Sequence, residues 1–69
     1  MGNIIVNFNK EIYSLASIKE AIKAYKGLTV FSVATKKDYF TVTLSKIDKD
    51  VETTIKDEFC NYVLAETRS

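Results

Sequence analysis

The amino-acid sequence predicts one small α+β domain over residues 1–69, with the element order β-α-β-β-α and both helices packed on one face of a three-stranded sheet. Three observations support this prediction. The spacing of apolar residues changes four times, between the period of two typical of strands and the period of three to four typical of helices. The chain has 69 residues, 46% of them hydrophobic and 28% charged, which suits one globular domain. It has no proline and only two glycines, so no flexible linker divides it.

The first half of the chain predicts a strand followed by a helix. Apolar and polar residues alternate over residues 4–9, which is typical of a strand. Over residues 15–26, apolar side chains recur three and four residues apart, which predicts an amphipathic helix. Ser14 is a suitable N-cap, and Ser17, at the head of a capping box, is the alternative one turn later. Gly27 is expected to end the helix in the left-handed conformation, which glycine adopts at the lowest cost.

The second half predicts a hairpin and a second helix. Residues 28–35 and 39–45 alternate in polarity on either side of a polar tripeptide, which predicts two antiparallel strands. Residues 51–63 return to helical spacing, and carboxylates suited to a helix N-terminus stand at its start: Asp48, Asp50 and Glu52. A crossover through the first helix makes the first two strands parallel, and the third strand fits between them. The favoured sheet order is therefore 1-3-2, with 3-2-1 left open.

Composition excludes several classes of chemistry. The chain has no histidine and a single cysteine, Cys60, which removes histidine metal sites, Ser-His-Asp triads and an internal disulfide. We therefore expect no enzyme activity, no metal and no cofactor, and we expect Cys60 to be a small buried hydrophobe. The lack of disulfides, of a leader peptide and of the roughly 20 apolar residues that a membrane helix needs predicts a cytoplasmic protein without membrane contact.

Charge is unevenly distributed, although ten basic and nine acidic residues nearly balance. Residues 1–46 hold seven lysines and three acids, whereas residues 47–69 hold three bases and six acids. The lysine stripe of the first helix is typical of a solvated helix face. The lack of arginine before Arg68 argues against a phosphate-binding surface, because phosphate readers favour arginine forks. Nucleic acid is therefore not the expected partner.

The sheet face without helices is the first candidate binding surface. Ile5 and residues 39, 41 and 43 are expected to point outward on it. The second strand is ambiguous, because both of its phases are apolar: one buries Leu28, Val30 and Ala34, and the other buries Phe31 and Val33. The first phase would give the open face an apolar patch of the kind that usually marks an interface. That patch comprises Ile5, Phe31, Val33 and Tyr39.

The last helix offers a second candidate surface and a family resemblance. Leu64 lies off the centre of the apolar stripe and widens it toward a partner, while Tyr62 is expected to pack in the core. Residues 58–66, Glu-Phe-Cys-Asn-Tyr-Val-Leu-Ala-Glu, resemble the C-terminal motif of the His-Xaa-Ser system protein HxsD family, which Tyr62, Leu64 and Glu66 match. Ala65 stands where the motif has arginine. Residues 6–8 and 12–19 are similar to the opening strand and first helix of that family.

The resemblance implies a small accessory protein of cassettes that pair radical-SAM proteins with a peptide bearing His-Xaa-Ser repeats. It does not imply an iron–sulfur cluster, which usually takes about four thiolates. We therefore expect a non-enzymatic module that docks a peptide or a radical-SAM-type protein, either by strand addition at the second strand's free edge or on an apolar surface. The expected contact residues are Phe31, Val33 and Tyr39 on the sheet and Tyr62, Leu64 and Glu66 on the last helix. A self-associating protein, dimeric through the open face, is the alternative, and a small nucleic-acid binder is a third reading.

Overall fold

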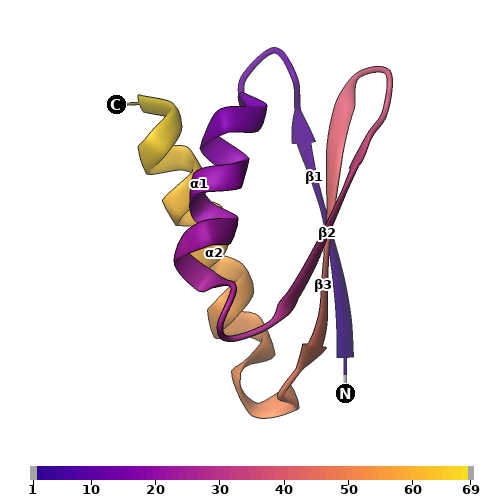
Figure 1. Ribbon diagram of the computed structural model, residues 1–69, viewed down its shortest axis with the longest axis vertical. Coiled ribbons are helices and arrows are strands. Elements are labelled where there is room, and N and C mark those ends of the chain that lie inside the picture. Colours follow the sequence, from indigo (N-terminus) through magenta and orange to yellow (C-terminus); the bar gives the residue numbers. More distant parts are fainter. Residues whose placement is uncertain (1, 69) are drawn as a thin grey trace.

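A computed structural model describes residues 2–68, apart from the side chains of residues 2 and 49 (Figure 1). Three strands, two α-helices and a short 3₁₀ turn follow one another in the predicted order. They are β1 (Gly2–Asn9), α1 (Leu15–Tyr25), β2 (Val30–Thr35), β3 (Tyr39–Ile47), η1 (Lys49–Val51) and α2 (Glu52–Arg68). β3 lies between β1 and β2 and is antiparallel to both. Both helices lie on one face of the sheet, so the predicted α+β fold with sheet order 1-3-2 is confirmed (Figure 1).

The core lies between the sheet and the helices, and Phe59 of α2 is at its centre. The Phe59 side chain is fully buried. Its ring centroid lies 6.0 Å from that of Phe8 on β1, 6.4 Å from that of Tyr25 on α1 and 5.0 Å from that of Phe31 on β2. One ring thus connects all layers of a domain too small to bury much surface. The buried apolar cluster is completed by Ile18, Ala21, Val42, Leu44, Ile47, Ile55 and Val63.

The two ends of α1 show one correct prediction and one wrong one. Ser14 is the N-cap, because its Oγ accepts a hydrogen bond from the Ser17 N–H at 3.1 Å. At the other end, Gly27 does not have the left-handed backbone that we expected, because no described glycine has a positive φ. Lys26 is the C-cap in a right-handed conformation, and the Leu28 N–H donates to the Tyr25 carbonyl at 2.9 Å. A tight turn of ordinary conformation therefore ends the helix.

β3 runs two residues further than the sequence pattern predicted, through a β-bulge. Ile4 pairs with Leu44, but Gly2 pairs with Ile47, so β3 carries one extra residue between these pairs. Lys46 takes up the irregularity with a φ of 57°, the only positive φ among non-glycine residues in the described chain. Because the extra residue shifts the alternation by one, Lys46 is exposed and Ile47 is fully buried.

The predicted carboxylate cap of the last helix is present one turn ahead of α2. The Asp48 Oδ1 accepts a hydrogen bond from the Asp50 N–H at 3.0 Å, and the Asp48 carbonyl accepts one from the Val51 N–H at 3.1 Å. These bonds satisfy free amides of η1, which leads directly into α2. α2 then buries Ile55, Phe59 and Val63 along one face.

Candidate protein-interaction site

The strand register fixes the phase of β2 and corrects one expectation. Phe31 pairs with Leu44 and Val33 pairs with Val42, and both of these β3 partners are buried under the helices. Phe31 and Val33 therefore lie on the helix side of the sheet, and their expected place on the open face is wrong. Burial of the Phe31 ring beside Phe59 decides the phase, and it leaves Val30 on the opposite face with 49% of its surface exposed.

Apart from Lys46 at the bulge, the strand residues that the structure describes on the open face carry no charge. The expected outward residues Ile5, Tyr39, Thr41 and Thr43 are there, and Ile5 is 64% exposed. The Thr41 Oγ1 donates a hydrogen bond to Asn7 Oδ1 at 2.8 Å across two strands. The face is formed by Asn3, Ile5 and Asn7 of β1, Val30, Ser32 and Ala34 of β2, and Tyr39, Thr41, Thr43 and Ser45 of β3.

The size of this face limits what it can bind by itself. Three strands about 4.8 Å apart and some seven residues long at about 3.3 Å each cover roughly 300 Å². Two copies stacked through this face would bury roughly 600 Å² in total, against at least about 1,200 Å² in ordinary stable interfaces. Stacking of the open faces alone would therefore give a smaller interface than stable dimers usually have.

The outer edge of β2 offers backbone groups in addition to surface. The Lys36 N–H donates to the Tyr39 carbonyl at 2.8 Å, so the backbone of Lys36 faces β3. Since backbone direction alternates along an antiparallel strand, the N–H and C=O groups of Phe31, Val33 and Thr35 face away from β3. β2 is an edge strand, so no strand of the described chain pairs with these groups.

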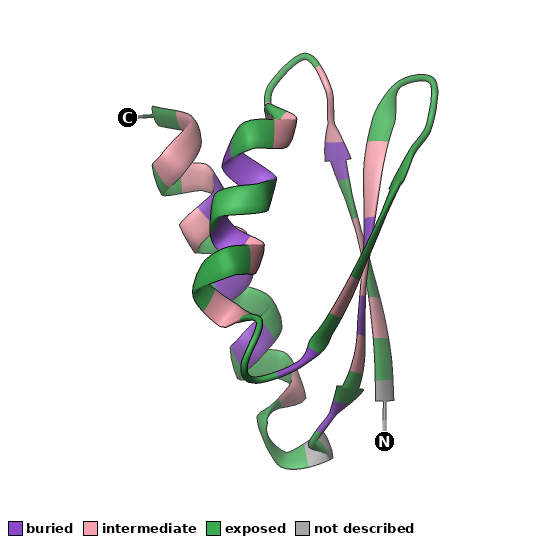
Figure 2. Ribbon diagram, viewed as in Figure 1, coloured by how far each residue is buried: buried purple, intermediate pink, exposed green. Residues whose placement is uncertain are grey.

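β2 is also poorly covered near the hairpin. Residues 32–35 are all exposed, and Val33 is 36% exposed although it faces the helix side (Figure 2). The strand, Val-Phe-Ser-Val-Ala-Thr, holds neither a charged residue nor a proline, which are the usual means of blocking an edge. This half of β2 therefore presents free backbone groups with exposed side chains on both faces.

The edge of β1 is the natural comparison. The same alternation directs the backbone of Ile5 and Asn7 outward from the sheet. On its helix side, however, β1 is better covered, because Phe8 is buried and Val6 packs against the core. The Asn9 carbonyl at its end already accepts hydrogen bonds from two N–H groups of the following turn, at 3.1 and 2.9 Å. β2 is thus the more accessible edge.

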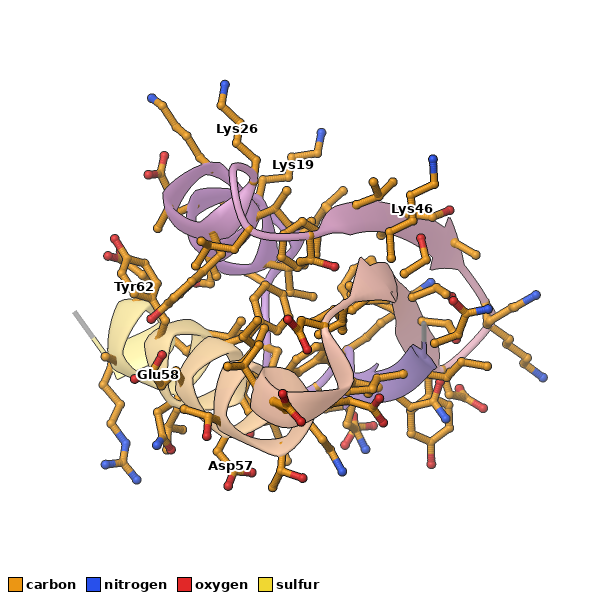
Figure 3. All side chains as sticks on the ribbon, turned by 90° about the horizontal axis from the view of Figure 1, so that it is seen from below. Lys19, Lys26, Lys46, Asp57, Glu58 and Tyr62 are labelled. Carbon is orange, nitrogen blue, oxygen red and sulfur yellow. The ribbon has the colours of Figure 1, made fainter. Side chains whose placement is uncertain are left out.

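The three candidates on α2 lie apart from this edge. Tyr62 is half-buried, and its ring packs at 5.8 Å against that of Tyr25, so it connects the two helices as expected. Figure 3 shows Tyr62 on the far side of the helix layer from the sheet. Leu64 and Glu66 are partly buried on the same helix. The structure therefore does not bring the sheet candidates and the helix candidates into one site.

The thiol of Cys60 and a surface hollow are two other features with polar or reactive groups. Cys60 is partly buried against the core, and this burial raises the pKa of its thiol; Lys56 lowers that pKa and Asp57 raises it. A hollow of about 350 Å³ lies between the β1–α1 turn and the hairpin, where the Lys10 N–H donates to the Asp38 carbonyl at 3.0 Å. Its lining is Asn9, Lys10, Glu11, Lys37, Asp38 and Tyr39, none of which is buried. Neither feature gathers groups into a reactive arrangement.

Within residues 2–68, no three His, Cys, Asp or Glu side chains are grouped so that they could hold a metal ion. Nor does any helix in that range combine the length and apolar character needed to cross a membrane. No family model, curated protein or solved structure matches the chain.

The sequence favoured the free edge of the second strand, but it could not say which backbone groups face outward there, because the direction of backbone groups is not encoded in polarity. One signal was present: β2 is the only expected strand that lacks both charge and a consistent buried phase. The bulge also had a signal, since Leu44 and Ile47 are both apolar but an odd number of residues apart.

Proposed function

We propose that this chain is a non-enzymatic, cytoplasmic binding module that takes up an extended segment of a peptide or protein as an additional strand beside β2. The observation that supports this most directly is the outward backbone of Phe31, Val33 and Thr35 on an edge strand without charge or proline. Strand addition uses main-chain hydrogen bonds for affinity and alternate side chains for selectivity.

The side chains around the edge fit this mode. A strand added beside β2 would place every second side chain on the helix side, next to Val33 and Phe31. Its remaining side chains would extend the open face beside the uncharged Ser32 and Ala34. Phe31 and Val33 thus keep a part in binding, from the face opposite to the one the sequence suggested, and Tyr39 extends the open face near the hairpin.

The resemblance to the HxsD family suggests one setting for this binding, a helper in peptide modification that presents a peptide to a radical-SAM-type protein. In that setting Tyr62, Leu64 and Glu66 of α2 would form a second contact surface, separate from the peptide edge. Two surfaces on opposite sides of one small domain suit a protein that holds two partners together.

Amide exchange measured by NMR tests the proposal. In the free protein, the amides of Phe31, Val33 and Thr35 should exchange quickly, while those of Ser32 and Ala34, which face β3, should be protected. A synthetic peptide of seven alternating valine and threonine residues with two acidic residues at each end should protect the first three amides. Absence of any such protection at millimolar peptide would contradict strand addition.

Proline substitutions separate the two edges. Val33→Pro removes an outward N–H without breaking the bonds between β2 and β3, and proline is tolerated on edge strands. Ile5→Pro makes the same change on the outer edge of β1. Loss of peptide binding in Val33→Pro with retention in Ile5→Pro would support the β2 edge, and the opposite pattern would contradict it. Concentration-dependent sedimentation without peptide would instead indicate self-association.

A further inference from the structure

We infer that the segment taken up by β2 carries acidic residues at both ends of an uncharged centre. This inference rests on the proposed function and names the chemistry of the partner. It depends on where the lysines lie relative to β2.

Lysines gather on the side of the molecule that carries α1 and β2. In Figure 3, Lys19 of α1, the C-cap residue Lys26 and Lys46 of β3 all point to this side. All three are exposed. Between residues 15 and 38 there are five lysines and two acids, Glu20 and Asp38. The surroundings of the β2 edge are therefore positive, although the chain as a whole has a formal charge of only +1.

Acidic side chains gather elsewhere. Figure 3 shows Asp57 of α2 pointing away from the lysine side, whereas Glu58 lies at the side of α2 near Tyr62. From residue 47 onward the chain has six acids and three bases. The labelled residues thus show part of the charge separation of the sequence in space, with the three lysines toward α1 and β2 and Asp57 on the far side of α2. An acidic ligand would be attracted toward one side and repelled from the other.

The lysines also lie at both ends of β2 and not along it. At its first residue, Val30 pairs with Ser45, and the bulge residue Lys46 comes next. At its last residue, Thr35 is followed directly by Lys36 and Lys37. The six residues between are uncharged and span about 20 Å. A matching strand would have about six uncharged residues, with acidic side chains just beyond each end.

Three peptides of the same alternating valine–threonine centre test this inference by fluorescence anisotropy. The first has two acidic residues at each end, the second has serines there, and the third has lysines. At 50 mM salt the acidic peptide should bind about tenfold more tightly than the lysine peptide, with the serine peptide between them. At 500 mM salt this difference should fall below about threefold, because salt screens exposed charges.

Charge reversal locates the effect. Lys36→Glu combined with Lys46→Glu should remove the preference for the acidic peptide. Lys56→Glu combined with Arg68→Glu makes the same change in net charge on α2 and should leave the preference intact. Far-UV circular dichroism confirms that both variants fold, and the salt dependence of the unaltered protein tests the inference if either does not. Equal binding of all three peptides would overturn the inference and leave strand addition standing, whereas no binding of any peptide would overturn both.

Discussion

At the bulge residue Lys46, we expect glycine to be more stabilising than valine, which is the opposite of the order in an ordinary strand. An L-residue in the left-handed region is strained by roughly 1–2 kcal/mol, and glycine relieves this strain but loses roughly 0.5–1 kcal/mol through its greater freedom in the unfolded chain. With a φ of 57° and an exposed side chain, Lys46 has no packing to lose. We therefore expect Lys46→Gly to leave the free energy of unfolding unchanged or to raise it by about 1 kcal/mol.

A β-branched residue at the same place should do the reverse. Lys46→Val should lower the free energy of unfolding by about 1–2 kcal/mol, because valine tolerates a positive φ poorly. In a regular strand the order is opposite, and valine exceeds glycine by up to about 1 kcal/mol. Thr43, on the same strand within the regular ladder, provides the control: Thr43→Val should be more stable than Thr43→Gly.

Urea unfolding followed by circular dichroism measures all four variants. In a domain of this size, 1 kcal/mol corresponds to about 4–8 °C in Tm, so the order is also visible in thermal melts. If Lys46→Val proved as stable as Lys46→Gly, the left-handed bulge would be refuted, and with it the reason for the burial of Ile47.

Three further predictions concern the core, the thiol and the helix cap. Phe59→Ala should lower the free energy of unfolding, measured in urea, by about 3–5 kcal/mol. This is a large part of the roughly 3–10 kcal/mol expected for a chain of this length. Phe59→Leu should lower it clearly less, and equal losses would contradict the central place of Phe59 in the core. Cys60 should react with iodoacetamide at pH 8 more slowly in the folded protein than in urea, because burial raises the pKa of its thiol. Because the thiol ionises more readily in the unfolded chain, the free energy of unfolding should fall as the pH rises from the ordinary thiol pKa through the raised folded pKa, and Cys60→Ala should abolish this dependence. Ser14→Ala should lower the free energy of unfolding in urea by about 1 kcal/mol, because it removes the hydrogen bond from the Ser17 N–H. Ala16→Ser, on the exposed face of the same helix, is the control. A loss in Ser14→Ala no larger than in this control would argue against the cap.

The element order could be predicted because the alternation of residues 4–9 and 39–45 has one clear phase each. The sheet order 1-3-2 was favoured over 3-2-1 by the crossover through the first helix, which makes the first two strands parallel. The phase of β2 could not be predicted, since Val30 and Phe31 are both apolar and neither alternative breaks the pattern. A tertiary contact decides the phase of β2, because the ring of Phe31 packs against the ring of Phe59 on α2. Packing between elements distant in sequence overrides local preference in such cases.

Backbone conformation was the other weak point of the sequence. Gly27 suggested a left-handed backbone conformation, but its φ is not positive. Lys46 does have a positive φ, although it is not a glycine and nothing in the sequence predicted this. Leu28 closes its turn onto Tyr25 with ordinary angles, so the freedom of glycine is unused there. At Lys46 the backbone strain is offset by the burial of Ile47, which the bulge places in the core. The sequence predicted that the site is the free edge of the second strand. It did not predict which amides face outward there, because that follows from the hydrogen bonds of the hairpin.

The unblocked edge of β2 also sets a condition on solubility. An edge strand that can pair with a ligand can also pair with an edge strand of another copy of the protein. The outer strand β1, which is also uncharged, gives each copy a second edge for such pairing. We expect overproduced protein to precipitate or form fibrils unless an occupying segment is co-expressed with it. A segment bound at this edge, as proposed above, would therefore also protect the protein from aggregation.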